Sequence, residues 1–343
     1  MNRQSNFRDC AAMFAIGLDI GYSNLKLAFG KVSDNGLAKP AVTRVLPAGA
    51  GRLSDLPLRM GKADGDTDAL VVNVNGEKWA AGVDQARLET SVRELHADYP
   101  ASDAYRALFH AALLMGEHDT VDQLITGLPV SQFLDKDLRA RLSDRLTGQH
   151  QVTAGRAITV KNTLVVPQPF GAYLDLLNTV EDAAELEESR IMVIDPGFFS
   201  VDWIAIEEGE IRKASSGTSK RAMSVLIETV NSLIQEDHGG SAGIERLEQA
   251  VRQGKTSVPV FGTPVELAPY MDKAAQRVAV EALKEMKQQL RANDRAVDVV
   301  LIVGGGAKAY EAAARDLFPK SRPVLPQEPV LANARGFWSA AVQ

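Results

Sequence analysis

Apolar positions along this chain follow two periods, the two-residue period of strands and the 3.6-residue period of helices. Strand-like apolar runs occupy residues 13–18, 123–130, 150–167, 190–194, 201–206 and 297–303. Helical spacing is found over residues 103–115, 133–146, 167–180, 217–234, 244–253, 264–292 and 304–318, and from 331 to the end. Because strands and helices alternate, the pattern predicts an α/β fold.

Two acidic turns have nearly the same construction. Residues 19–26 (DIGYSNLK) follow the apolar run MFAIGL, and residues 195–202 (DPGFFSVD) follow the apolar run RIMVI. In each turn a Gly stands two residues after the Asp, and a second strand-like run follows a short turn segment. Such a turn can present backbone N–H groups to a phosphate while its carboxylate faces a magnesium ion or its bound water. Two such turns facing each other would form a nucleotide clamp.

Either turn alone is also explained as an ordinary hairpin turn, because Asp, Gly, Ser and Asn all favour turns. Lys26 favours the functional interpretation, since a lysine two residues beyond the turn can point back toward an anion. The chain contains no GxxxxGK[ST] segment, which excludes a P-loop. A Rossmann fingerprint is also excluded, because both acidic turns lead into strands rather than helices.

Two further segments have both a structural and a functional interpretation. Gln168 stands between two prolines at the start of a predicted helix. It is either a loop glutamine or a group that orients water for attack on a γ-phosphate. The three glycines at 304–306 follow a buried strand and precede a helix. They make either a tight connection or a place where backbone approaches adenine, ribose or phosphate.

Composition sets limits on these interpretations. With 343 residues, 45% hydrophobic and 24% charged, the chain has material for about two domains. A formal net charge of −6 argues against direct, non-specific nucleic-acid binding. The single cysteine, Cys10, excludes an intramolecular disulfide and a cysteine-cluster metal site, and the five histidines lack ligand spacing. No run approaches the roughly 18 apolar residues of a membrane span, so a cytoplasmic location is expected.

The spacing of four motifs resembles the actin-like ATPase superfamily over nearly the whole chain. DIGYSNLK is similar to its first phosphate loop, PQPFGAY (167–173) to its first connecting helix, DPGFFSVD to its second phosphate loop and VGGGA (303–307) to its adenosine motif. The first loop, the hairpin VNGEKWAAG (74–82) and the C-terminal LANARGFW (331–338) are most similar to plasmid-segregation actins of the ParM/StbA type.

The resemblance implies an actin-like (ribonuclease H-like) α/β fold, with two related domains around a nucleotide cleft that holds ATP and Mg²⁺. It implies that Asp19 and Asp195 hold the magnesium through water, and that Gln168 positions the attacking water. The other residues that it assigns to the nucleotide are Gly21, Tyr22, Ser23, Asn24 and Lys26 from the first loop, Gly197, Phe198, Phe199, Ser200 and Asp202 from the second, and Gly304, Gly305, Gly306 and Ala307 for adenosine. Phe198 and Phe199 depart from the family pattern, which has small residues there.

The expected domain organisation follows from the same comparison. Residues 1–12 are expected to form a flexible tail, and the acidic segment 182–188 marks the best domain boundary. We expect domain I at 13–183, with a small inserted subdomain at about 40–100, and domain II at 184–318. The segment 319–343 is expected to return to domain I.

The implied function is a filament-forming ATPase that drives plasmid DNA segregation. Because the chain is acidic, it would reach a centromere-like DNA site through a DNA-binding adaptor protein. Two alternatives remain open: a sugar-type small-molecule kinase of the same superfamily, and an ATP-binding scaffold without hydrolysis. The choice between ATP and GTP also stays open, since the adenosine motif is mostly backbone.

Overall fold

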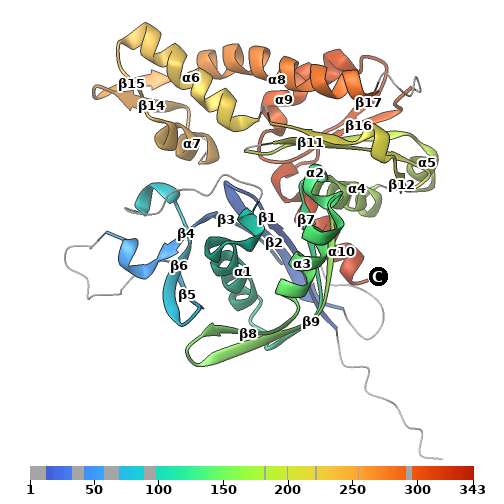
Figure 1. The fold of residues 1–343 in the computed structure, drawn as a ribbon. Coiled ribbons are helices and arrows are strands. Elements are labelled where there is room, and N and C mark those ends of the chain that lie inside the picture. The colour runs from blue at the N-terminus through green and yellow to red at the C-terminus, as the bar shows by residue number, and fades with distance from the viewer. Residues whose placement is uncertain are drawn as a thin grey trace, which may run out of the picture.

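The computed structural model describes residues 13–32, 42–57, 69–88, 98–180, 183–198, 200–220, 222–253, 255–290 and 296–343. Several segments discussed above lie outside these ranges: the tail at 1–12 with Cys10, parts of the expected subdomain, the start of segment 182–188, and Phe199. Figure 1 shows that the first half of the chain and the C-terminal helix form the lower part of the molecule, and the rest of the second half forms the upper part.

A six-stranded sheet organises the first half, in the order β3-β2-β1-β7-β9-β8. Its central strand β1 (Phe14–Ile20) is buried along its whole length. It pairs antiparallel with β2 (Asn24–Lys31) and parallel with β7 (Thr120–Leu128). The sheet is completed by β3 (Val42–Pro47), β8 (Gly148–Thr153) and β9 (Arg156–Pro167).

Because both faces of β1 are covered, its side chains alternate between two cores. Phe14, Ile16 and Leu18 share one core with α1 (Asp103–Met115). Ala15 on the opposite face shares a second core with the C-terminal helix α10 (Ala332–Ala341). The end of the chain therefore packs against its beginning.

The second half repeats this plan in a sheet of order β12-β11-β10-β16-β17. Here β10 (Ile191–Pro196) pairs antiparallel with β11 (Val201–Glu207) and parallel with β16 (Val299–Ile302). One face packs on a core shared with α6 (Met223–His238), α8 (Ala268–Leu290) and α9 (Ala307–Leu317). The other face packs on α4 (Gln168–Thr179). The remaining strands of this sheet are β12 (Glu210–Ile211), β13 (Gly217–Ser219), which pairs with β11, and β17 (Arg322–Val324).

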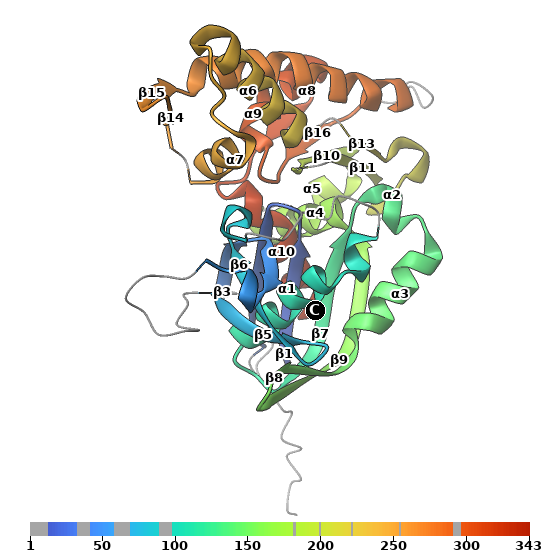
Figure 2. The same cartoon turned by 60° about the vertical axis from the view of Figure 1, so that its left-hand side comes forward.

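Smaller elements surround the two sheets (Figure 2). A three-stranded sheet of β4 (Gly49–Arg52), β6 (Glu77–Val83) and β5 (Leu70–Val74) lies beside α1, and its Asn75-Gly76 turn has the positive φ angles predicted for such a hairpin. Near the boundary between the halves lie α2 (Val130–Phe133) and α5 (Ala183–Glu188), whereas α3 (Lys136–Leu146) packs on β9 in the first half. In the second half, α7 (Ile244–Arg252) is followed by the hairpin of β14 (Ser257–Val260) and β15 (Thr263–Glu266).

The prediction of one helix over residues 217–234 is wrong at its start. Gly217–Ser219 forms β13, which pairs antiparallel with β11, and α6 begins only at Met223. The physical reason is that the Thr218 hydroxyl, which could have capped a helix, donates a hydrogen bond to the buried carboxylate of Asp202. Tertiary pairing therefore overrides the local pattern.

No helix in the described part of the chain is both long and apolar enough to cross a membrane.

Candidate functional site

The two acidic turns have the same backbone geometry. In the first turn the Gly21 N–H donates to the Asn24 carbonyl over 3.0 Å, and in the second the Gly197 N–H donates to the Ser200 carbonyl over 2.8 Å. Each turn joins two antiparallel strands in which the Asp lies opposite a polar residue. Asp19 lies opposite Lys26. Asp195 lies opposite Asp202.

A cavity of about 320 Å³ is lined by both turns. Most sequence-predicted site residues line it, from segments far apart in the chain: Asp19, Gly21, Tyr22, Ser23, Asn24, Lys26, Gln168, Asp195, Gly197, Phe198, Ser200, Asp202, Gly305 and Gly306. Gly304 and Ala307 do not line it, and Phe199 lies outside the described residues. The wall also includes residues that the sequence did not single out, among them Tyr99, Tyr105 and Glu248.

The Asp19 carboxylate is the centre of a buried polar network. Lys26 Nζ lies 2.9 Å from its Oδ2 atom, and Gln168 Nε2 donates to its Oδ1 atom over 3.0 Å. Gln168 is the first residue of α4 and follows the strand β9, which ends at the cavity. Its bond to Asp19 uses the amide N–H, so its carbonyl oxygen remains an acceptor that could orient a water molecule.

Asn333 joins the two acidic turns and was not predicted from the sequence. Its Nδ2 atom lies 2.7 Å from Asp195 Oδ2 and 3.4 Å from Asp19 Oδ2. It belongs to α10, and its side chain is buried. The segment LANARGFW carried the family resemblance, but nothing in its local pattern marks one buried amide as part of a site.

Burial and neighbouring charges change the protonation of the network. The pKa of Asp195 is raised to about 7, chiefly by burial; Asp19 and Asp202 add to the increase, whereas Lys26 and the Asn333 hydrogen bond counteract it. For Lys26, burial lowers the pKa, but the carboxylates of Asp19 and Asp195 outweigh that effect, so the pKa is raised overall. Lys26 therefore remains a cation between two carboxyl groups.

Asp202 is held by protein donors on both of its oxygens. Its Oδ1 atom accepts from the Val130 N–H at 2.8 Å and from Thr218 Oγ1 at 2.6 Å. Its Oδ2 atom accepts from Ser200 Oγ at 2.6 Å. Burial raises the pKa of Asp202, and these three hydrogen bonds counteract that effect. The carboxylate thus ties the second turn to the start of α2 in the first half.

The three glycines at 304–306 have different roles. Gly304 has a φ of 79°, and a Cβ there would overlap Asp195 Oδ1. A Cβ on Gly306 would lie 2.8 Å from the Pro196 carbonyl oxygen. A Cβ on Gly305 would meet nothing, and Gly305 lines the cavity. Gly304 and Gly306 therefore allow close packing on the second turn, and Gly305 presents open backbone to the cavity.

Two contacts join the first half to α7, and the residues of the first of them, Ser23 and Glu248, line the cavity. Ser23 Oγ donates to Glu248 Oε1 over 3.0 Å, and Gln249 Nε2 donates to Asp84 Oδ2 over 3.2 Å. On the first-half wall, Tyr22 stacks on Tyr99 with ring centroids 4.8 Å apart. On the second-half wall, Phe198 packs against the core of the second half while also lining the cavity. Its bulk is thus partly accommodated by that core.

The donor set fits magnesium better than a transition metal. Among the described residues there is no group of three or more His, Cys, Asp or Glu side chains that could hold a metal ion. Magnesium needs fewer protein ligands, because it keeps several waters and uses one or two carboxylates together with substrate phosphates. Asp19 and Asp195 fit that requirement. The pocket-lining Asn24 has a buried Oδ1 atom without a hydrogen-bond partner among the described residues, which a ligand donor or a metal-bound water would satisfy.

Two family models match the sequence. Residues 17–171 match the N-terminal domain of actin-like proteins, and residues 193–315 match the C-terminal domain of the archaeal actin homologue MreB-like family. The two matches include both acidic turns and leave only short segments of the chain uncovered. The chain belongs to the actin-like protein family.

Solved structures of actin-like proteins share its fold. The archaeal actin homologue Ta0583 matches with a TM-score of 0.72 at 19% identity, covering 96% of this chain and 99% of that chain. A ParM filament of 15 strands from Clostridium botulinum matches with a TM-score of 0.69 at 19% identity, covering 96% and 99%. ParM from Bacillus thuringiensis with AMPPNP matches with a TM-score of 0.62 at 15% identity, covering 96% and 98%. Comparison with curated protein sequences finds no match. The likeness establishes the two-domain, mixed α/β actin-like fold.

Proposed function

We propose that this actin-like protein is a Mg²⁺-dependent ATPase whose nucleotide state controls its assembly into filaments. The observation that carries the proposal is the pair of matching acidic turns around one cavity, with Asp19, Lys26 and Asp195 brought together. Three similar structures support it: Ta0583 was solved in complex with ADP, a Bacillus thuringiensis ParM with AMPPNP, and a Clostridium botulinum ParM as a filament.

The chemistry of phosphoryl transfer suits this arrangement, because it depends on positioning and charge neutralisation more than on covalent steps. Lys26 would neutralise phosphate charge, and the Gln168 amide oxygen would orient the attacking water. Magnesium, when bound, would neutralise further phosphate charge, and Asp19 and Asp195 would hold it through water. The Gly21 N–H is already used inside its turn, so phosphate contacts of the first loop fall to the following residues, Tyr22 to Asn24.

The division into domains is proposed on the same basis. The boundaries at 13–183 and 184–318, with the segment 319–343 returning to domain I, agree with two repeated sheets and with the packing of α10 on β1. Loss of the γ-phosphate would remove a bridge between the two acidic turns and bias closure of the domains. In a head-to-tail filament, such a change alters the contact between subunits.

A role in plasmid segregation is the finer form of the proposal. The net charge of −6 favours an indirect connection to DNA, through a basic adaptor protein that binds a centromere-like site. The alternatives are a sugar-type kinase of the same superfamily and a scaffold that binds ATP without turnover. The lining of the cavity favours the ATPase over the kinase, since no carboxylate beyond Asp19, Asp195, Asp202 and Glu248 is found among its described lining residues. Two of these four are already bonded across the cleft, Asp202 to Val130 and Glu248 to Ser23.

Release of inorganic phosphate from ATP tests the proposal. We expect magnesium-dependent release by the wild type and loss of release in Asp195→Ala, because that variant lacks one of the two carboxylates. The control is Lys308→Ala, at an exposed position two residues after Gly306, and this variant should retain activity. Turnover in the wild type that is unaffected by Asp195→Ala would refute the assignment of the second turn, and no turnover would favour the scaffold.

A further inference from the structure

Asn333 occupies the space between the two acidic turns as a neutral donor. It is 3% exposed, and its single NH₂ group serves Asp195 at 2.7 Å and Asp19 at 3.4 Å. A carboxylate oxygen only accepts, so the amide must direct its NH₂ group toward both. Its own oxygen is buried with no hydrogen-bond partner among the described residues. An unpaired buried acceptor costs free energy, so the hydrogen bonds from the NH₂ group to the two carboxylates must offset that cost.

The helix that carries Asn333 is fixed by close backbone packing. A Cβ on Gly17 of β1 would overlap the Ala334 carbonyl oxygen of α10. A Cβ on Gly336 of α10 would overlap the Gly171 carbonyl oxygen of α4. Glycine at these positions lets β1, α4 and α10 approach backbone to backbone. A shift of α10 along either neighbour would break these contacts.

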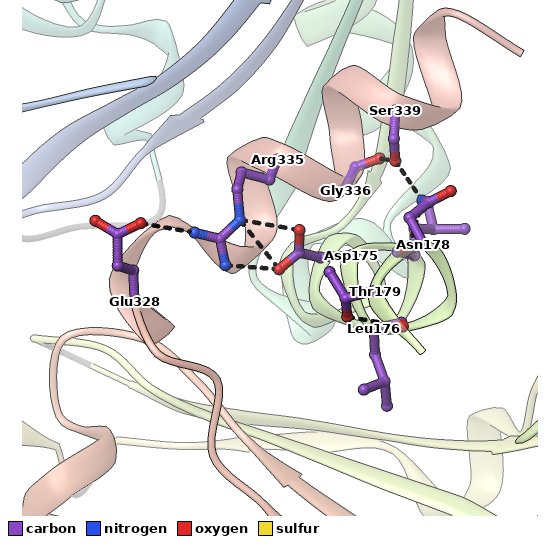
Figure 3. Close-up of polar contacts among 9 residues, drawn as sticks. Asp175, Leu176, Asn178, Thr179, Glu328, Arg335, Gly336 and Ser339 are labelled. Carbon is purple, nitrogen blue, oxygen red and sulfur yellow. Dashed lines mark hydrogen bonds and ion pairs between the residues drawn. The ribbon is translucent and has the colours of Figure 1, made fainter. Parts of the chain in front are cut away.

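Polar contacts fix the rotation of α10 as well (Figure 3). Arg335 Nη2 and Nε reach the Asp175 carboxylate of α4 at 2.7 and 2.9 Å, in a bidentate pair that is largely buried. Arg335 also lies 3.4 Å from Glu328, and Asn178 of α4 donates to Ser339 over 2.8 Å. A bidentate pair has a defined geometry as well as an energy, so it sets the helix orientation. Asn333, two residues before Arg335, is therefore held at a fixed place.

We propose that Asn333 is a positioning residue that holds Asp19 and Asp195 at the separation at which both face one magnesium ion. The inference rests on the proposed function, because it concerns how that site takes its metal. A neutral amide suits this role better than a charged residue. A lysine in its place would compete with the metal, and a carboxylate would add a third negative charge to the pair.

Binding of a fluorescent ADP analogue, measured in magnesium and in EDTA, tests the inference. For the wild type we expect magnesium to increase the affinity. In Asn333→Ala we expect this magnesium-dependent gain to fall by about 10- to 100-fold, as is typical when a group that orients metal ligands is lost. The affinity in EDTA should change far less than the magnesium-dependent gain, since the phosphate-binding turns keep their own hydrogen bonds.

Two further variants complete the design. Asn162→Ala removes an exposed hydrogen bond to the Asp122 carbonyl, away from α10 and from the carboxylates, and it should behave as the wild type. Asn333→Ser keeps a donor at the site, so it should lose less of the magnesium-dependent increase in affinity than Asn333→Ala. If the alanine variant does not fold, the serine variant is compared with the wild type in its place.

The outcomes separate the two proposals. A wild type that binds no ADP overturns the proposed function, and the inference with it. A wild type that binds ADP with a magnesium gain, together with an Asn333→Ala variant that keeps the gain, overturns the inference alone. Equal losses in magnesium and EDTA also overturn it, because they indicate a general structural role.

Discussion

Asp202 of β11 accepts a hydrogen bond from the backbone N–H of Val130 at 2.8 Å, and so joins the second acidic turn to the first half of the chain. The same oxygen accepts from Thr218, and the other oxygen accepts from Ser200. These partners indicate that Asp202, which the family resemblance assigned to the nucleotide, has a structural part in the cleft wall.

Replacing Asp202 should destabilise the fold. In Asp202→Ala the buried Val130 N–H loses its acceptor, and we expect the free energy of unfolding to fall by about 3 kcal/mol. Thr218→Val removes a donor and leaves the carboxylate in place, so it should cost about 1 kcal/mol. Urea unfolding curves measure both. If both variants lower the free energy of unfolding by the same small amount, the carboxylate does not tie the two halves together.

Lys26 should stabilise the empty protein as well as bind phosphate. Lys26→Met leaves the buried Asp19 and Asp195 without a cation, and we expect it to lower the free energy of unfolding by about 3–5 kcal/mol. The control is Lys161→Met, which breaks an equally direct pair with Asp122 at an exposed site (57% and 26% exposed) and should cost less than about 1 kcal/mol. Similar values for the two variants in unfolding curves would contradict the assignment of Lys26 to a buried network.

Within the segment 304–306, Gly304 should matter for stability and Gly305 for nucleotide binding. Gly304→Ala should be strongly destabilising, because its φ of 79° is unfavourable for alanine and its Cβ would overlap Asp195. Gly305→Ala meets open space and should keep the thermal midpoint within about 2 °C, while it alters nucleotide affinity. Thermal unfolding followed by nucleotide titration checks both. A stable Gly304→Ala protein would contradict the packing described here.

Stability should fall at acidic pH because of His110. Burial lowers its pKa from 6.5 to about 4, while its Nδ1 atom bonds the Asn73 carbonyl at 2.7 Å. Between these values the unfolded chain binds a proton that the folded protein does not, so stability decreases as the pH falls from 6.5 to 4. The change attributable to His110 is about 3 kcal/mol.

The variant His110→Gln should lose stability less steeply over the same pH range, since an amide keeps a donor for Asn73 without titrating. His238→Gln, an exposed change at the surface, serves as the control and should follow the wild-type slope. Chemical unfolding at several pH values gives the comparison. Parallel slopes for wild type and His110→Gln would show that His110 does not cause the acid sensitivity.

Local patterns in the sequence were sufficient for much of this structure. The two acidic turns, the Asn75-Gly76 hairpin and α1 follow from hydrophobic period and turn chemistry, which act over a few residues. The repeated Asp-x-Gly turn also predicted that the two turns line one cavity, since equivalent turns occupy equivalent places in the two sheets.

Long-range contacts could not be predicted in this way. Asn333 bonds Asp19 from 314 positions away, and neither neighbouring residue indicates that its amide is buried. Glu248 meets Ser23 only because α7 folds over the cleft. The pattern of residues 217–234 places Thr218 in a helix, because those residues alone do not reveal the strand β11 with which Thr218 pairs.

The central claim is nucleotide-controlled assembly, and electron microscopy of the purified protein with ATP, with ADP and without nucleotide tests it most directly. We expect filaments with ATP and Mg²⁺, few or none with ADP, and none with ATP in the Asp195→Ala variant. Absence of filaments in all three conditions at micromolar protein, or filaments that form equally well without nucleotide, would contradict the account.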